Sequence, residues 1–109
     1  MATFSDFEKI DIRIGKIVSI EDAETRKPMF KMKIDFGKLG IKQTIAGLKA
    51  FYKKEDLFNR KVAAVVNLEP RKMGPDVSEC MILAAVVGED EKVVFLQPEK
   101  DIENGAKIF

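Results

Sequence analysis

Hydrophobic and polar residues alternate most regularly in the segment MFKMKIDF, residues 29–36. A period of two is typical of a β-strand with one buried side and one side that faces solvent. The sequence therefore predicts a strand here, and its exposed face, which carries Lys31 and Lys33, is mostly basic. The predicted buried face comprises Phe30, Met32, Ile34 and Phe36.

The segment IKQTI, residues 41–45, continues the alternation after the turn GKLG. We predict that its two isoleucines face the core and that Lys42 and Thr44 face outward. The two strands then form a hairpin, and the lysines of both strands share one face of it.

The chain before this hairpin predicts a helical turn and a strand. Ser5 and Glu8 have the spacing of a helix capping box, so we expect one turn of helix there. Residues 10–20 predict a long strand with a bulge or sharp bend at Gly15. The predicted core face of this strand comprises Ile10, Ile12, Ile14, Val18 and Ile20.

Two continuous apolar runs, residues 62–68 and 80–87, show no alternation. We therefore expect two strands that are buried on both faces. Residues 47–59, which precede the first run, are too irregular for a strand and predict a short helix or two helical turns. Its expected packing positions are Leu48, Phe51, Leu57 and Phe58.

The C-terminal part of the chain predicts further β-structure. The segment GEDEK, residues 88–92, is typical of an acidic hairpin turn, and VVFLQP after it predicts a strand. The ending NGAKIF predicts a final turn and a short strand.

The expected order is three strands, a helix and two strands, with additional strands at the C-terminus. This is the order of an OB-fold, a mainly β, five-stranded Greek-key barrel with a helix between strands three and four. A chain of 109 residues is long enough for one hydrophobic core and too short for two. We therefore predict a single OB-fold domain over residues 1–109.

Nothing in the sequence indicates a membrane segment or a secretory signal. No stretch reaches the roughly 18 to 20 apolar residues of a membrane helix. The N-terminus MATFSDFEKI has no basic region followed by an apolar core. We expect a cytoplasmic protein that does not associate with membranes.

The sequence has no histidine, and Cys80 is its one cysteine. The lack of histidine removes the usual general base, the commonest metal ligand and every Ser-His or Cys-His nucleophile. Cys80 has no cysteine to pair with and opens an apolar run, so we expect a buried thiol. The sequence also has no Gly-rich phosphate loop and no spaced acidic cluster. We predict a protein that is not an enzyme, with no catalytic residue, metal site or cofactor.

The distribution of charge is more informative than its sum of +1. Residues 1–25 have a net charge of −3, residues 26–72 of +9 and residues 73–109 of −5. A basic middle segment can present a positive face to a polyanion even when the whole molecule is nearly neutral. These lysines could also simply solvate a surface.

The OB-fold offers a test, because its ligand surface comprises strands two and three and the first and fourth connecting loops. We expect the cations of these parts of the chain to converge there, and this favours a polyanion ligand. They are Arg26 and Lys27 in the first loop, Lys31, Lys33 and Lys42 on the strands, and Arg71 and Lys72 beside Ser78 in the fourth loop.

The residue types on this surface indicate which polyanion binds. OB-folds that bind single strands expose aromatic side chains on strands two and three, on which bases stack. Here the predicted exposed positions are lysines and a threonine, whereas Phe30 and Phe36 face the core. Such a face is suited to the phosphates of a structured RNA, which is recognised by its shape and backbone.

Four longer motifs, FEKIDIRIGKIV, RKPMFKMKIDFGKLGIKQTIAG, NLEPRKMGPDVSECMILAA and LQPEKDIENGAKI, resemble the tRNA-binding domain family. That family includes the C-terminal domain of methionyl-tRNA synthetase, free-standing dimeric tRNA-binding proteins and the secretion chaperone CsaA. The resemblance runs from about Phe7 to the C-terminus. RKP, IDFG and GIKQ are most similar to CsaA, whereas TIAG and NLEP look more like the synthetase branch.

The resemblance implies an OB-fold homodimer that binds the outside corner of tRNA, with an aminoacyl-tRNA synthetase as a possible partner. The apolar ends MATF and KIF are candidates for the dimer interface. In the fourth loop, the resemblance implies RNA contacts at Asn67, Leu68, Arg71, Lys72, Gly74, Ser78 and Met81.

Several of these residues also have purely structural interpretations. Asn67 could bind only loop backbone, Ser78 could stabilise a turn, Gly74 is expected to supply a positive φ, and Met81 is expected to pack in the core. The alternative function is that of a CsaA-like chaperone for unfolded export polypeptides. The predicted RNA-binding set is Arg26, Lys27, Lys31, Lys33, Lys42, Asn67, Arg71, Lys72, Ser78 and Met81.

Overall fold

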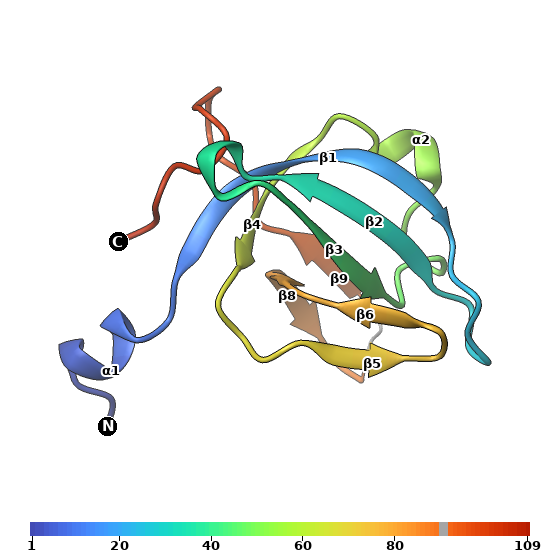
Figure 1. Ribbon diagram of the computed structural model, residues 1–109, viewed down its shortest axis with the longest axis horizontal. Coiled ribbons are helices and arrows are strands. Elements are labelled where there is room, and N and C mark those ends of the chain that lie inside the picture. The colour runs from blue at the N-terminus through green and yellow to red at the C-terminus, as the bar shows by residue number, and fades with distance from the viewer. Residues whose placement is uncertain (90–91) are drawn as a thin grey trace.

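The computed structural model describes residues 1–89 and 92–109. Within these residues, five antiparallel strands form one curved sheet with the order β3-β2-β1-β4-β7 (Figure 1). The chain between β3 and β4 contains the short helix α2 (Lys54–Leu57). This arrangement confirms the predicted mainly β OB-fold. The five strands are β1 (Ile12–Asp22), β2 (Phe30–Asp35), β3 (Ile41–Ala46), β4 (Lys61–Val65) and β7 (Met81–Ile82).

The free edge of β3 meets residues 78–80, and this contact nearly closes the barrel. The backbone amide of Glu79 donates to the carbonyl of Gln43 at 2.7 Å. The Thr44 hydroxyl donates to the carbonyl of Cys80 at 2.9 Å. The edge that a sheet of this kind would expose is therefore satisfied by the chain itself.

The predicted alternation of β2 is confirmed in full. Its buried face lies inside the barrel, and its exposed face carries Lys33. The core around it includes Ile17, Phe30, Met32, Ile34, Phe36, Leu48, Leu57, Val62, Ala64, Val66, Cys80 and Phe95.

In β1, the bulge lies elsewhere than predicted. The register with β2 shifts between Ile17 and Ser19, and not at Gly15. The extra residue makes Ile17 fully buried, whereas Ile10 is exposed and does not belong to the core face. A Cβ atom on Gly15 would lie 2.5 Å from both Ile34 Cγ2 and the Phe36 ring, so this glycine serves the close packing of two strands.

The predicted faces of β3 are wrong for Ile41, Lys42 and Thr44, whereas Ile45 is buried as predicted. Lys42 pairs with Ile34 and Thr44 pairs with Met32, so both side chains point to the core side of the hairpin. Ile41 points outward and is 59% exposed. Thr44 is buried because its hydroxyl has a hydrogen-bond partner inside, and Lys42 therefore does not share a face with Lys31 and Lys33.

The long fourth loop contains a hairpin of its own. Strand β5 (Arg71–Met73) pairs with β6 (Asp76–Ser78), and Gly74 between them has the expected positive φ of 61°. Figure 1 shows β6 between β5 and the barrel strand β3. We call this unit the β5–β6 hairpin.

The two apolar runs differ in burial. The first is buried on both faces as predicted from Val62 to Val66, but its last two residues, Asn67 and Leu68, are exposed. The prediction is wrong for the second run, which breaks after β7 and continues as β8 (Ala84–Val87), paired with β9 (Lys92–Phe95). Val86 and Val87 are exposed on this hairpin. The predicted acidic turn between β8 and β9 includes residues 90 and 91, which lie outside the described residues.

The remaining elements are short. Helix α1 (Phe4–Glu8) is capped by Thr3 and Asp6 rather than by the predicted Ser5 and Glu8. A 3-10 turn, η1 (Gly37–Leu39), joins β2 to β3. The predicted C-terminal strand is a turn followed by one β-bridge from Lys107 to Arg13.

The segment around α2 packs largely as expected. Leu48 and Leu57 are buried, but Phe58 is 54% exposed and does not pack in the core. Among the described residues, every helix is too short or too polar to cross a membrane.

Candidate nucleic-acid interface

The first loop of the barrel lies against the tip of the β5–β6 hairpin (Figure 1). A Cβ atom on Gly74 would lie 2.7 Å from the carbonyl oxygen of Glu24, so the two backbones are in close contact. Arg26 and Lys27 line a shallow depression together with Met73 and Gly74 at this junction. The fold thus brings two exposed cations of the first loop beside the hairpin that carries Arg71 and Lys72.

The outer face of β2 carries two lysines in very different surroundings. Lys33 is exposed, opposite Ser19 and Gln43 on the neighbouring strands. Lys31 is only 22% exposed, and its ammonium lies 3.0 Å from Glu21 Oε1 and 3.3 Å from Asp76 Oδ1. The hydrogen bond to Glu21 first, and the one to Asp76 next, raise the pKa of Lys31 above its usual value. Lys31 therefore stays charged, but two carboxylates of the protein offset that charge.

Lys42 of β3 is half-buried and points to the core side of the β2–β3 pair, away from Lys31 and Lys33. Burial first, and the charge of Glu79 next, raise the pKa of Cys80 to about 12, and the charge of Lys42 opposes this rise. Cys80 lines a cavity of about 410 Å³ together with Arg71, Leu68 and Met81. Glu69 and Glu79 also line it, so the cavity combines one guanidinium group and two carboxylates with two exposed apolar side chains.

Most of the predicted cations are available to a ligand. Among residues 1–89 and 92–109, Lys31 is the one member of the predicted set that makes an ion pair within 4.0 Å. An unpaired cation keeps its full attraction for an outside phosphate, whereas a paired one must first lose its partner. The cations without such a pair to a described residue are Arg26, Lys27, Lys33, Lys42, Arg71 and Lys72.

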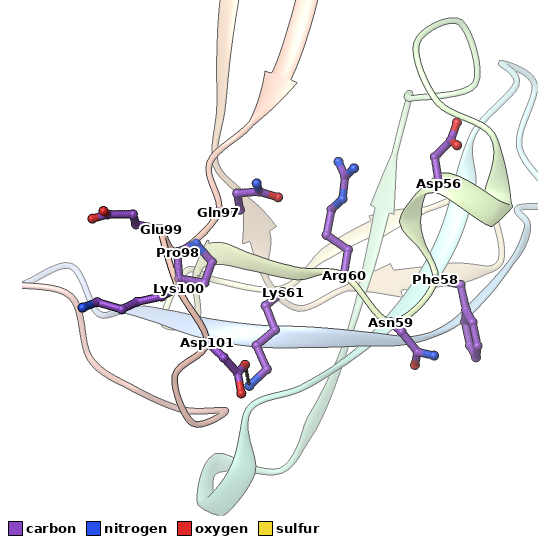
Figure 2. Close-up of a pocket in the computed structure, with 10 residues that line it drawn as sticks. All are labelled: Asp56, Phe58, Asn59, Arg60, Lys61, Gln97, Pro98, Glu99, Lys100 and Asp101. Atoms are coloured by element: carbon purple, nitrogen blue, oxygen red, sulfur yellow. Dashed lines mark ion pairs between the residues drawn. The ribbon is translucent and has the colours of Figure 1, made fainter.

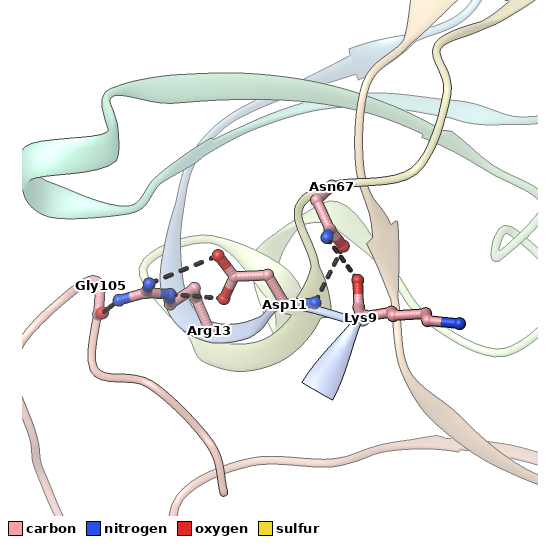
Figure 3. Close-up of polar contacts among 5 residues, drawn as sticks. All are labelled: Lys9, Asp11, Arg13, Asn67 and Gly105. Carbon is pink, nitrogen blue, oxygen red and sulfur yellow. Dashed lines mark hydrogen bonds and ion pairs between the residues drawn. The ribbon is translucent and has the colours of Figure 1, made fainter. Parts of the chain in front are cut away.

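The side chain of Asn67 is bonded to backbone (Figure 3). Its Nδ2 donates to the carbonyl of Lys9 at 2.8 Å, and its Oδ1 accepts from the amide of Asp11 at 2.9 Å. The amide of Asn67 thereby ties the end of β4 to the start of β1. Arg13 adds to the same junction, because it pairs with Asp11 at 2.7 Å and donates to the carbonyl of Gly105 at 3.1 Å.

Ser78, a predicted RNA contact, is buried, whereas Met81, which was expected to pack in the core, is exposed. Ser78 is buried, and its hydroxyl accepts a hydrogen bond from the amide of Ile45 at 3.2 Å. It therefore attaches β6 to β3. Met81 is 44% exposed and lies at the mouth of the cavity, so the expected core packing is wrong.

Three residues that hold Lys31 or the β5–β6 hairpin in place are not among the predicted site residues. Glu21 and Asp76 hold Lys31, and Gln43 donates from its Nε2 to the carbonyl of Val77 at 3.0 Å. Their partners lie 10, 45 and 34 positions away in the chain, so no local pattern could indicate them.

A second depression lies between residues 56–61 and 97–101 (Figure 2). Its Lys61 pairs with Asp101 at 2.9 Å, and its Arg60 lies over the ring of Tyr52 at 5.5 Å. No member of the predicted binding set is among the described residues that line it. We therefore place the candidate interface at the first loop, β2 and the β5–β6 hairpin.

Comparison with known proteins shows which family the chain belongs to. A family model described as "Putative tRNA binding domain" matches residues 12–107. Methionine–tRNA ligase of Pyrococcus furiosus is 45% identical over 106 residues, which cover 97% of this chain and 14% of that protein. The chain thus spans only a small part of the length of the curated relatives it matches.

Solved structures of similar size also match. The chaperone CsaA of Bacillus anthracis has a TM-score of 0.93 at 39% identity, with 100% of this chain and 99% of that chain covered. The chaperone CsaA of Picrophilus torridus has a TM-score of 0.91 at 41% identity, with both chains covered in full. The family match extends over most of the chain, and the likeness in fold extends over all of it. The chain therefore belongs to the tRNA-binding domain family.

Proposed function

We propose that this protein binds tRNA, or a structured RNA of similar shape, without catalysing a reaction. The contacts are made to phosphates by the cations of the first loop, β2 and the β5–β6 hairpin. Phosphate contacts fix position and orientation on an RNA and carry little sequence information. We therefore expect weak discrimination among tRNAs.

One observation carries the proposal. Arg26 and Lys27 lie beside a hairpin that presents Arg71 and Lys72, and the ion-pair geometry leaves all four without a carboxylate partner among the described residues. These four exposed cations lie in two segments that touch at Gly74, which supports the attraction of a polyanion to this part of the surface, although Glu24 lines the same depression as Arg26 and Lys27. The membership in the tRNA-binding domain family supports the same ligand class.

The test is the salt dependence of tRNA binding. Each phosphate neutralised contributes a slope of about 0.7 to 0.9 in log Kd against log salt. The variant Arg71→Ala/Lys72→Ala should weaken binding and lower the slope by roughly that amount for each cation. Lys100→Ala/Lys107→Ala, which removes two exposed cations elsewhere, is the matched control. An unchanged slope in the first variant would remove the hairpin from the interface.

A chaperone activity is the second candidate, because two solved structures that cover the chain fully are of the chaperone CsaA. The cavity lined by Leu68 and Met81 offers apolar side chains to an unfolded polypeptide. Apolar contacts persist at salt concentrations that screen phosphate contacts. Binding of unfolded polypeptide that survives such salt, and that Met81→Ser weakens, would support this candidate.

We further propose that the protein works in the cytoplasm as a homodimer, with a synthetase as a possible partner. Met1, Phe4 and Phe109 are strongly exposed apolar side chains near the two ends of the chain. A dimer would double the number of phosphates reached and raise avidity. Light scattering across a dilution series tests this, and Phe4→Ser/Phe109→Ser should shift the mass toward the monomer.

A further inference from the structure

Lys31 connects three separate parts of the chain. It lies on β2, and its ammonium reaches Glu21 on β1 and Asp76 on β6. The side chains of Lys31 and Asp76 are only 22% and 18% exposed, whereas that of Glu21 is 60% exposed. The contact with Asp76 is therefore the more sheltered of the two pairs, and it joins the barrel to the β5–β6 hairpin.

The β5–β6 hairpin has few other attachments near its tip. Further along β6, the carbonyl of Val77 accepts from Gln43 of β3 at 3.0 Å, and the Ser78 hydroxyl accepts from the amide of Ile45 at 3.2 Å. At the tip, Gly74 touches the first loop through backbone contact. Asp76 lies just after this tip, so its pair with Lys31 is the charged attachment that fixes the tip against the sheet.

Strand β5 is joined to the barrel through β6, the strand that carries Asp76. Arg71 and Lys72 lie on β5, which pairs with β6, and β6 lies between β5 and the barrel (Figure 1). A hairpin that moves at its tip would spread these two cations over many orientations. Ordering them on binding would then cost conformational entropy, which a fixed hairpin avoids.

We propose that Lys31 is a positioning residue and not a phosphate contact: its pair with Asp76 holds the β5–β6 hairpin so that Arg71 and Lys72 face the RNA. This inference rests on the proposed function. It removes Lys31 from the set of residues that touch the ligand, and it gives the acidic Asp76 a favourable part in binding a polyanion.

The substitution Asp76→Asn separates this role from simple electrostatics, because the two predict opposite signs. If only the field matters, loss of a negative charge and release of Lys31 should tighten tRNA binding. If the pair positions the hairpin, the same substitution should weaken binding by about three- to tenfold. Glu69→Gln is the matched control, since Glu69 is an exposed carboxylate of the same loop. The Glu69→Gln protein should bind tRNA more tightly than wild type, because it loses one negative charge.

Variants of Lys31 and Asp76 together form a double-mutant cycle. Lys31→Met should weaken binding, and Lys31→Arg, which can still bridge two carboxylates, should restore it close to wild type. The double variant Lys31→Met/Asp76→Asn should bind no more weakly than the weaker single variant, because both act through one contact. Restoration of wild-type affinity in the double variant would instead indicate cancelling charges and overturn the proposal.

Hydrogen exchange provides a readout that does not need RNA. In Asp76→Asn, the cross-strand amides of β5 and β6 should exchange faster, while those of β1 and β4 keep their protection. Exchange at wild-type rates in the hairpin would overturn the positioning role even if affinity falls. Wild-type affinity of Asp76→Asn, with Arg71→Ala/Lys72→Ala still weak, would overturn this inference and leave the proposed function standing. Wild-type affinity of Arg71→Ala/Lys72→Ala would instead refute the hairpin surface of the proposed function.

Discussion

The variant Asn67→Ala tests whether this residue supports the fold or contacts the ligand. Its amide holds two backbone groups of another segment, the carbonyl of Lys9 and the amide of Asp11. Donor faces acceptor and acceptor faces donor, so the side chain has the orientation that this backbone requires. Alanine removes both contacts and leaves the start of β1 less firmly attached to the end of β4.

The expected cost follows from these two hydrogen bonds. Each contributes about 0.5–1.5 kcal/mol in net terms. Asn67 is exposed, so water can replace the lost partners, and the free energy of unfolding should fall by about 1–2 kcal/mol. For a domain of about 100 residues, this corresponds to a fall in Tm of roughly 5–10 °C.

The assay combines thermal denaturation with tRNA binding at several salt concentrations. We expect a lower Tm and an unchanged salt slope for Asn67→Ala, because no charge is removed. The isosteric Asn67→Asp should be destabilised as well, since it places an oxygen against the carbonyl of Lys9. Gln97→Ala, which truncates an exposed amide, should stay within about 0.5 kcal/mol of wild type. An unchanged Tm with a large loss of tRNA affinity would refute a structural role.

Two further predictions concern the core. Gly15→Ala should destabilise the protein by about 1–3 kcal/mol, because its Cβ would lie 2.5 Å from buried side chains, whereas Gly47→Ala, with its nearest neighbour at 3.8 Å, should not; equal urea midpoints would contradict this. Burial raises the pKa of Cys80 to about 12 from 9.0, so the folded state keeps a proton that the unfolded chain releases. The stability from this thiol is present below about pH 9 and is lost as pH rises toward about 12. In urea titrations between about pH 8 and 11, the free energy of unfolding should therefore decline less steeply for Cys80→Ala than for wild type. Parallel pH profiles of the two proteins would show that the thiol does not contribute.

The sequence predicts the orientation of a strand well where one face of that strand is exposed to solvent. In residues 29–36, lysines alternate with large apolar residues, and only one orientation buries the latter. Such a signal was missing in IKQTI, where a threonine can be buried once its hydroxyl finds the carbonyl of Cys80. The partner that lets Thr44 be buried lies 36 positions away, so the local pattern could not indicate it.

Apolar composition alone also failed to predict burial. Residues 62–66 and 80–87 look alike in sequence, yet the first run is enclosed by neighbouring strands and the second leaves the sheet as part of an exposed hairpin. A local pattern shows that a segment is apolar but not which other segment covers it. The bulge in β1 has the same cause, since Ile17 and Val18 are equally suited to the core.

The charge pattern of the candidate interface was predictable only in part, for a related reason. The net charge of +9 over residues 26–72 counts lysines that the fold neutralises with acids from the flanking segments. Lys31, Lys49 and Lys54 pair with Glu21 or Asp22, which precede that stretch. Asp76 and Asp101, which follow it, pair with Lys31 and Lys61. Among the described residues, the cations without such pairs include the four of the first loop and the β5–β6 hairpin, but also Lys33, Lys38, Lys42, Lys53 and Arg60 of the same stretch. The net charge of a stretch therefore does not show which of its cations remain without a carboxylate partner.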